Sequence, residues 1–217
     1  MKRTPSTRSP GYDTRHALRH LRRADRNMAE VISAVGPCQI TLRSMPSPFA
    51  ALMRAITYQQ LSGKAAATIL GRVLDLFPQE TGPTPEALLR IPNPKLRGAG
   101  LSRNKLLSIK DLAARSLDGT VPEFRQLARM SDEEVIERLT AVRGVGRWTA
   151  EMLLIFNLGR PDVLPVSDLG VRKGFQLAYG MKRLPAHSTI ERAGRAWAPY
   201  RSVASWYLWR ATDTLTP

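Results

Sequence analysis

Hydrophobic residues recur every three or four positions along most of the chain, which is the spacing of one face of an α-helix. The first such run extends from Leu18 to Val35 and stops at Gly36, and it predicts one long N-terminal helix. Short extended pieces fit residues 39–43 and 163–166, but neither alternates long enough to build a sheet. The pattern therefore predicts an all-α fold.

Polar residues that favour helix N-termini mark where several of these helices begin. Ser62 follows a polar interruption and is expected to cap the helix after it. Ser131 and Glu134 have the spacing of a capping box, in which each side chain bonds the other residue's backbone amide. Ser188 and Glu191 repeat that spacing, so we expect a second capping box there.

A tight glycine turn interrupts the helical sequence near the middle of the chain. Gly144 and Gly146 are separated by one apolar residue, and helical sequence lies on both sides, so residues 132–157 predict a helix–hairpin–helix motif. Two glycines let the backbone turn sharply and approach another molecule closely. The second helix begins with amide groups that can bind an anion, such as a DNA phosphate.

The charge balance favours an anionic partner. The 217 residues include 33 Lys and Arg against 18 Asp and Glu, a net charge of +15, which points to nucleic acid, although a merely basic soluble protein fits charge alone. Cys38 is the one cysteine, so we expect no internal disulfide, no zinc and no iron–sulfur cluster. Without a membrane-spanning run or signal peptide, we expect an intracellular protein of the cytoplasm and nucleoid, or of the nucleus in a eukaryote.

The N-terminal region carries much of the positive charge. Residues 1–12 are polar, basic and proline-containing, and we expect them to be disordered. Five arginines share the first helix and could either contact DNA or form a solvated face, and both interpretations stay open: Arg15, Arg19, Arg22, Arg23 and Arg26.

Asp168 has two compatible interpretations. It precedes an apolar helical run that includes Val171 and Phe175, so it could cap that helix, a contribution of about 1 kcal/mol. A carboxylate held at a helix N-terminus is also favoured as the anion. Such an anion can stabilise positive charge developing on a deoxyribose ring or orient a water molecule for attack.

Aromatic residues offer either core packing or a binding surface for a base. Trp148 opens the second hairpin helix, and Trp206 and Trp209 lie on the last helix. Aromatics at helical spacing usually pack in a core, but a base turned out of a duplex must be held between aromatic or apolar faces. A cationic base, such as an N-alkylated purine, also gains a cation–π interaction.

Two segments of the chain together resemble a known family. Residues 144–150, followed by residues 164–174 with Asp168, are similar to the helix–hairpin–helix Gly/Pro-Asp superfamily of DNA glycosylases, within it to the alkylbase branch or DNA-3-methyladenine glycosylase II family. The resemblance covers residues 13–214. It implies the compact form without an extra N-terminal domain, a two-domain helical fold with the active-site cleft between the domains.

The expected domain organisation follows from this resemblance and from the helical pattern. Residues 13–45 supply a helix and an extended segment that pack on the second helical domain. Residues 46–163 form the central helical domain, which contains the hairpin motif. Residues 164–217 carry the catalytic aspartate and complete the second domain.

The resemblance also implies roles for individual residues. It makes Asp168 the catalytic carboxylate and places Trp148 and Trp209 in the pocket of the flipped base, with Met152 and Leu169 at positions that can be aromatic in larger relatives. Leu61, beside Gln60, matches the wedge that fills the gap left by that base, although the sequence alone favours an interhelical core leucine. Two further sets are implied: DNA-backbone contacts at Gly144, Val145, Gly146, Arg147 and Trp148, and carbonyls for a monovalent ion at Thr140, Val142 and Gly144.

The implied activity is hydrolysis of the N-glycosidic bond of alkylated bases, 3-methyladenine and 7-methylguanine above all, in double-stranded DNA. Trp148 stands where strand-cutting relatives carry a Schiff-base lysine, so we expect a monofunctional enzyme without lyase activity that leaves an abasic site. No cofactor is expected apart from a structural Na⁺ or K⁺, and the protein is expected to be a monomer. The alternatives are a non-catalytic module that binds damaged DNA, or a glycosylase for a different lesion class.

Overall fold

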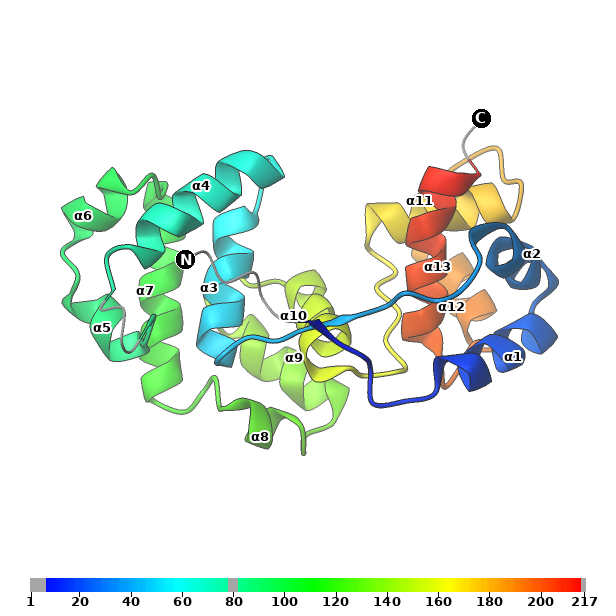
Figure 1. Ribbon diagram of the computed structural model, residues 1–217, viewed down its shortest axis with the longest axis horizontal. Coiled ribbons are helices and arrows are strands. Elements are labelled where there is room, and N and C mark those ends of the chain that lie inside the picture. Colours follow the sequence, from blue (N-terminus) through cyan, green and yellow to red (C-terminus); the bar gives the residue numbers. More distant parts are fainter. Residues whose placement is uncertain (1–6, 78–81, 216–217) are drawn as a thin grey trace. The chain divides into compact units, whose positions relative to one another are not determined.

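The computed structural model describes residues 7–77 and 82–215, and it is almost entirely helical (Figure 1). The all-α prediction is confirmed. None of the helices in the described ranges is long and apolar enough to cross a membrane. The elements are β1 (Thr7–Arg8), α1 (Thr14–Ala24), α2 (Arg26–Val35), β2 (Leu42–Arg43), α3 (Pro48–Tyr58), α4 (Gly63–Leu74), α5 (Pro85–Arg90), α6 (Asn93–Gly98), α7 (Arg103–Leu117), α8 (Phe124–Leu127), α9 (Asp132–Thr140), α10 (Arg147–Leu153), the π-helix η1 (Leu154–Leu158), α11 (Leu169–Ala178), α12 (His187–Gly194) and α13 (Arg201–Thr214).

A short antiparallel pair corrects the expectation for the N-terminal tail. Residues 1–6 lie outside the described residues, but β1 pairs with β2, with Thr7 opposite Arg43. The expectation of disorder over the whole of 1–12 was therefore wrong. Strand pairing satisfies backbone groups that a polar tail would otherwise leave to water, and the Arg8 guanidinium also donates to the Asn157 carbonyl at 3.4 Å.

The chain divides into two compact units. The central unit spans Met45–Leu153, and the terminal unit combines Met1–Ser44 with Leu154–Pro217. The central unit thus ends at residue 153, whereas the sequence placed the boundary after residue 163. The intervening segment belongs to the terminal unit because η1 packs against β2 and the Val163 amide donates to Ser202 Oγ on α13 at 2.9 Å.

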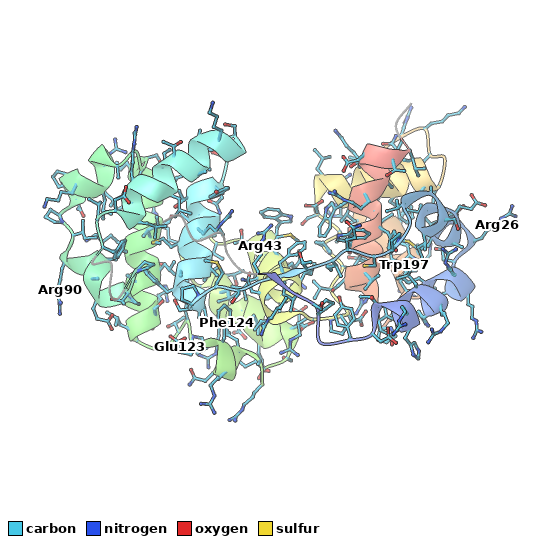
Figure 2. All side chains as sticks on the ribbon, in the orientation of Figure 1. Arg26, Arg43, Arg90, Glu123, Phe124 and Trp197 are labelled. Carbon is cyan, nitrogen blue, oxygen red and sulfur yellow. The ribbon has the colours of Figure 1, made fainter. Side chains whose placement is uncertain are left out.

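The core of the terminal unit is built around α13, which packs against α11, α2 and α1 (Figure 1). Trp197, labelled in Figure 2, is completely buried in this core together with Tyr207. Gly174 on α11 allows that helix to lie directly on α13, since a Cβ there would be 1.9 Å from the Leu208 carbonyl oxygen. Segments from both ends of the sequence therefore form one core.

The predicted single N-terminal helix is two helices, because Asp25 interrupts it. Asp25 has an extended backbone, with φ −153° and ψ 117°, and it ends α1 while capping α2 through the Met28 amide. Its other carboxylate oxygen accepts hydrogen bonds from the Tyr179 hydroxyl and, at 2.9 Å, from Trp197 Nε1. Burial and the hydrogen bond to Asp25 raise the pKa of Tyr179, so its phenol stays protonated and remains a donor. Helical periodicity continues through Asp25 and did not reveal the break.

The central unit packs α3 and α5 against α7, with α9 and α10 forming the hairpin pair. Two of the predicted caps are confirmed: Ser62 caps α4, and Ser131 forms the capping box of α9. The box predicted at Ser188 was wrong, because α12 begins at His187, two residues before the predicted start, and its N-cap, Ala186, has no polar side chain.

Candidate functional site

Asp168 caps α11, and its carboxylate is held by two donors. Its Oδ1 accepts a hydrogen bond from the Val171 amide at 2.8 Å and another from Trp209 Nε1 at 2.8 Å. Because one donor comes from α11 and the other from α13, the side chain is fixed by two helices. A half-buried carboxylate held in this way can stabilise a nearby cation or orient water.

Trp209 in turn lies in a stack of side chains from the terminal unit. The Phe156 ring lies 5.6 Å from the Trp209 ring at an interplanar angle of 30°, and the Arg43 guanidinium lies 5.2 Å from the Phe156 centroid. Gly170 leaves room for the indole, since a Cβ there would be 2.8 Å from Trp209 Cδ1. Trp209 therefore both contacts Asp168 and presents an aromatic surface, as its half-buried position allows.

Phe156 is a residue of this site that sequence reasoning missed. It lies in η1, where the chain adopts a π-helical turn directly after α10. A π-turn shifts the phase of side chains around the helix axis, so a pattern read at the α-helical period does not place it. Its aromatic character was the one available signal.

The other residues assigned to the base pocket are exposed or half-buried. Trp148 on α10 is 44% exposed, although large aromatic side chains are usually buried. Met152, one turn further along α10, is half-buried. Leu169 is 55% exposed at the start of α11, beside Asp168. Trp148 and Met152 belong to the central unit, and Leu169 to the terminal unit.

The turn between α3 and α4 presents the expected wedge residue. Gln60 has φ +56° and is exposed, so the chain reverses sharply there. Leu61 follows it and is 38% exposed. The alternative of an interhelical core leucine therefore does not hold. The sequence could not decide between these two roles, because polar residues can flank a buried leucine as well as an exposed one.

The two hairpin glycines have different structural requirements. Gly144 has φ +75°, and a Cβ there would lie 2.7 Å from Ser108 Oγ. Gly146 lies outside the left-handed region, and a Cβ there would meet nothing within 4 Å. Fold geometry alone thus explains Gly144, whereas Gly146 leaves open space against which another molecule can lie.

The backbone amides of the hairpin are partly committed to the turn itself. The Val145 amide donates to the Val142 carbonyl at 3.1 Å. Within the described ranges the Gly146 amide donates to no protein acceptor, while its carbonyl accepts from Thr149 and Ala150. Gly146 is therefore positioned to donate to an incoming anion.

The Arg147 side chain is committed to carboxylates of the central unit. Its guanidinium bonds both oxygens of Glu133, at 2.6 and 3.1 Å, and its Nε bonds Glu151 at 3.1 Å. The hydrogen bond to Glu133 raises the pKa of Arg147, and the same bond lowers the pKa of Glu133. This side chain joins α9 to α10. Because its guanidinium is occupied by these two carboxylates, the backbone amides are better placed than the Arg147 side chain to bind a phosphate.

The three carbonyls assigned to a monovalent ion lie at the C-terminal end of α9 and in the turn after it. The Val142 carbonyl accepts the Val145 amide, and the Gly144 carbonyl accepts Gln59 Nε2 at 3.0 Å. Each carbonyl oxygen has a second lone pair. Neutral oxygens near a helix C-terminus suit a hard cation, so Thr140, Val142 and Gly144 fit Na⁺ or K⁺.

The arginines of the N-terminal helices differ in their partners. Arg22 donates to Ser33 Oγ at 2.7 Å, and Arg26, which projects from the surface in Figure 2, pairs with Glu30 at 3.3 Å. Arg19 and Arg23 line a surface hollow of α1 together with two histidines. These last two arginines are the members of the set best placed to meet an external anion.

Comparison with known proteins identifies the family. Residues 53–199 match the HhH-GPD superfamily of base excision DNA repair proteins. The chain belongs to this superfamily. DNA-3-methyladenine glycosylase 1 of Schizosaccharomyces pombe is 37% identical over 195 residues, covering 89% of this chain and 85% of that protein. The alkylbase DNA glycosidase-like protein mag2 of the same yeast is 32% identical over 203 residues, covering 93% and 95%.

Solved structures of HhH-GPD proteins have the same fold. The S. pombe 3-methyladenine DNA glycosylase Mag1 in complex with abasic DNA gives a TM-score of 0.81 at 36% identity and covers 91% of this chain and 97% of its own. A DNA-3-methyladenine glycosidase from Bacillus halodurans gives 0.82 at 36% identity, with coverage of 96% and 93%. An 8-oxoguanine glycosylase/lyase from Clostridium acetobutylicum, at 17% identity and a TM-score of 0.71, shares the fold alone.

Proposed function

We propose that this HhH-GPD protein is a monofunctional DNA glycosylase of the 3-methyladenine glycosylase II type. It acts on alkylated bases in double-stranded DNA, with 3-methyladenine and 7-methylguanine as substrates, and leaves an abasic site. The relatives named as 3-methyladenine glycosylases support the lesion class. The observation that carries the proposal is the fixed carboxylate of Asp168, which a purely DNA-binding protein does not require.

The chemistry needs little beyond this carboxylate. In N3- or N7-alkylated purines the base carries a positive charge, so it leaves with the electron pair of the N-glycosidic bond as a neutral molecule. The sugar then bears the positive charge, which Asp168 stabilises as an anion. Water forms the new bond to C1′ and releases a proton. The leaving base needs no protonation, so the proposed mechanism requires no general acid.

Binding of the flipped base falls to the aromatic and apolar side chains. Trp148 and Trp209 stack on the base, and each such stack contributes about 1–3 kcal/mol. Met152 and Leu169 supply the remaining apolar contacts. Because these two are not aromatic, the site favours cationic bases, for which a ring face adds a cation–π attraction, over neutral ones.

The DNA backbone is bound by the hairpin, and Leu61 with Gln60 enters the duplex where the base leaves. The Gly146 amide and its neighbours contact a phosphate, and a Na⁺ or K⁺ on the carbonyls of Thr140, Val142 and Gly144 adds positive charge beside it. Replacing K⁺ by choline at constant ionic strength would then weaken DNA binding. Unchanged affinity would remove the ion from this proposal while leaving the amide contacts in place.

The substitution Asp168→Asn tests the reaction because it separates charge from capping. Asparagine caps a helix about as well as aspartate, and its Oδ1 can still accept from Val171 and Trp209. The variant should fold and bind DNA normally yet release base from methylated duplex at least about 100-fold more slowly, as expected for the loss of a charge aimed at the transition state.

The outcomes of this experiment separate the proposal from its alternatives. Release of 3-methyladenine and 7-methylguanine at an unchanged rate by Asp168→Asn would refute the mechanism. If the wild type binds DNA tightly and releases neither base, the protein is a damage-binding module or acts on a lesion absent from methylated DNA, which a panel of lesion duplexes distinguishes. Covalent trapping of the protein on methylated DNA by borohydride would contradict the monofunctional assignment.

A further inference from the structure

The C-terminal end of α3, directly before the wedge turn (residues 59–62), is held by a lysine from α7. Lys105 Nζ donates to the carbonyls of Thr57 at 2.7 Å and Gln59 at 2.8 Å. The last carbonyls of a helix have no partner within the helix and favour a cation. Partial burial lowers the pKa of Lys105. The start of the wedge turn is therefore fixed to α7.

The hairpin turn (residues 141–146) is held by the same helix. Asp111 Oδ2 accepts the Arg143 amide at 2.7 Å. Ser108 is 6% exposed, and its Oγ occupies the space that a side chain of Gly144 would need. Lys105, Ser108 and Asp111 follow one another at three-residue steps, so successive turns of α7 support first the wedge turn and then the hairpin turn.

Gln59 joins the two turns directly. Its side-chain Nε2 donates to the Gly144 carbonyl at 3.0 Å, while its own carbonyl accepts from Lys105. A carbonyl only accepts, so the amide nitrogen must be the atom that faces it. The two residues are 85 positions apart in the sequence, and their contact lies entirely within the central unit.

We propose that Gln59 is a positioning residue that couples the hairpin to the wedge. A phosphate held at the hairpin then fixes where Leu61 enters the duplex. This inference rests on the proposed function for the roles of the hairpin and of Leu61. Turning a base out of the stack requires unstacking energy of a few kcal/mol, and a wedge turn that is already ordered avoids an additional loss of backbone entropy at that moment.

Replacing Gln59 by methionine tests the coupling, since methionine has the same length but cannot donate. The probe is a duplex with a stable abasic-site analogue and 2-aminopurine in the opposite strand, whose fluorescence reports insertion of the wedge without any base release. In stopped-flow mixing, Gln59→Met should slow the fluorescence change about fivefold, the effect of one lost hydrogen bond. The matched control is Gln39→Met, the same change at an exposed glutamine, which should behave as wild type.

A second variant guards against a general folding defect. Gln59→Asn retains the amide, but it is one methylene shorter and should not reach Gly144. It should therefore show the same slow insertion, with a thermal midpoint and an affinity for undamaged duplex close to those of Gln39→Met. If Gln59→Asn and Gln59→Met both insert at the wild-type rate, the coupling does not exist.

A double-mutant cycle with Leu61→Ala shows whether Gln59 acts through the wedge. If it does, Gln59→Met should add almost nothing to the insertion defect of Leu61→Ala, because coupled residues are not additive. Additive defects would overturn the inference, since they would mean that Gln59 acts independently of Leu61. If the insertion defects are non-additive but the protein releases no base, the coupling is supported and the proposed function is refuted.

Discussion

The two hairpin glycines should respond in opposite ways to the same substitution, and the structure allows each response to be worked out. For Gly146→Ala, the added Cβ meets nothing within 4 Å and the backbone is outside the left-handed region. Its carbonyl accepts the first amides of α10, so it occupies an N-cap position, where alanine costs about 1 kcal/mol relative to glycine. Alanine also reduces the conformational entropy of the unfolded chain, which stabilises the folded protein by about 0.4–1 kcal/mol. The free energy of unfolding should therefore change by less than about 1 kcal/mol.

DNA binding by Gly146→Ala should fall much more than its stability. The Cβ projects into the space through which a phosphate must approach the Gly146 amide. A hydrogen bond to a charged group contributes about 1.5–3 kcal/mol, so losing this one weakens binding about 10- to 100-fold. Gly146 is thus expected to be a glycine required by the ligand and not by the fold.

Gly144→Ala should instead lower stability. The left-handed backbone, with φ +75°, costs a residue with a Cβ about 1–2 kcal/mol. The Cβ would also lie 2.7 Å from Ser108 Oγ, and overpacking of this kind costs about 1–3 kcal/mol. The sum is about 2–5 kcal/mol. Adding Ser108→Ala removes the contact with Oγ but leaves the backbone strain, so it should restore only part of the loss.

Urea denaturation and fluorescence anisotropy with a duplex containing an abasic-site analogue measure both quantities at one fixed salt concentration. The reasoning predicts a stable, weakly binding Gly146→Ala protein and an unstable Gly144→Ala protein. Wild-type affinity in Gly146→Ala would show that no ligand approaches this glycine. Wild-type stability in Gly144→Ala would show that the turn can relax without cost.

Three further outcomes are expected. Asp25→Ala should lower the free energy of unfolding by about 2–4 kcal/mol in urea denaturation, because α2 loses its cap and the buried Trp197 Nε1 loses its acceptor; a loss below about 1 kcal/mol would contradict this. Replacing Arg19 and Arg23 together by alanine should reduce the slope of log affinity for DNA against log salt by about 2, whereas an unchanged slope would assign them to a solvated face. Trp209→Phe should slow base release about tenfold at unchanged DNA affinity, since the carboxylate that it holds loses a hydrogen bond; release at the wild-type rate would exclude that positioning role.

The sequence by itself determined the features that depend on neighbouring residues. The caps at Ser62 and Ser131 were predicted because each hydroxyl bonds an amide only three residues away. Gly144 was identified as part of a turn because its conformation is a local property of the backbone. The prediction at Ser188 failed despite the correct spacing, since the N-cap of this helix lies two residues earlier, at Ala186. Local signals therefore established the all-α class and the hairpin, with errors of about one or two residues at helix ends.

Only the tertiary structure decided which side chains meet. Asp25 breaks the N-terminal helix and bonds Tyr179, which is 154 residues away. Trp209 holds Asp168 across 41 residues, whereas the family resemblance implied only a place in the base pocket. The exposure of Leu61 likewise depends on how neighbouring helices pack. Such contacts join elements that are distant in the chain, so their geometry is set by the packing of whole helices, and periodicity along one segment contains no information about it.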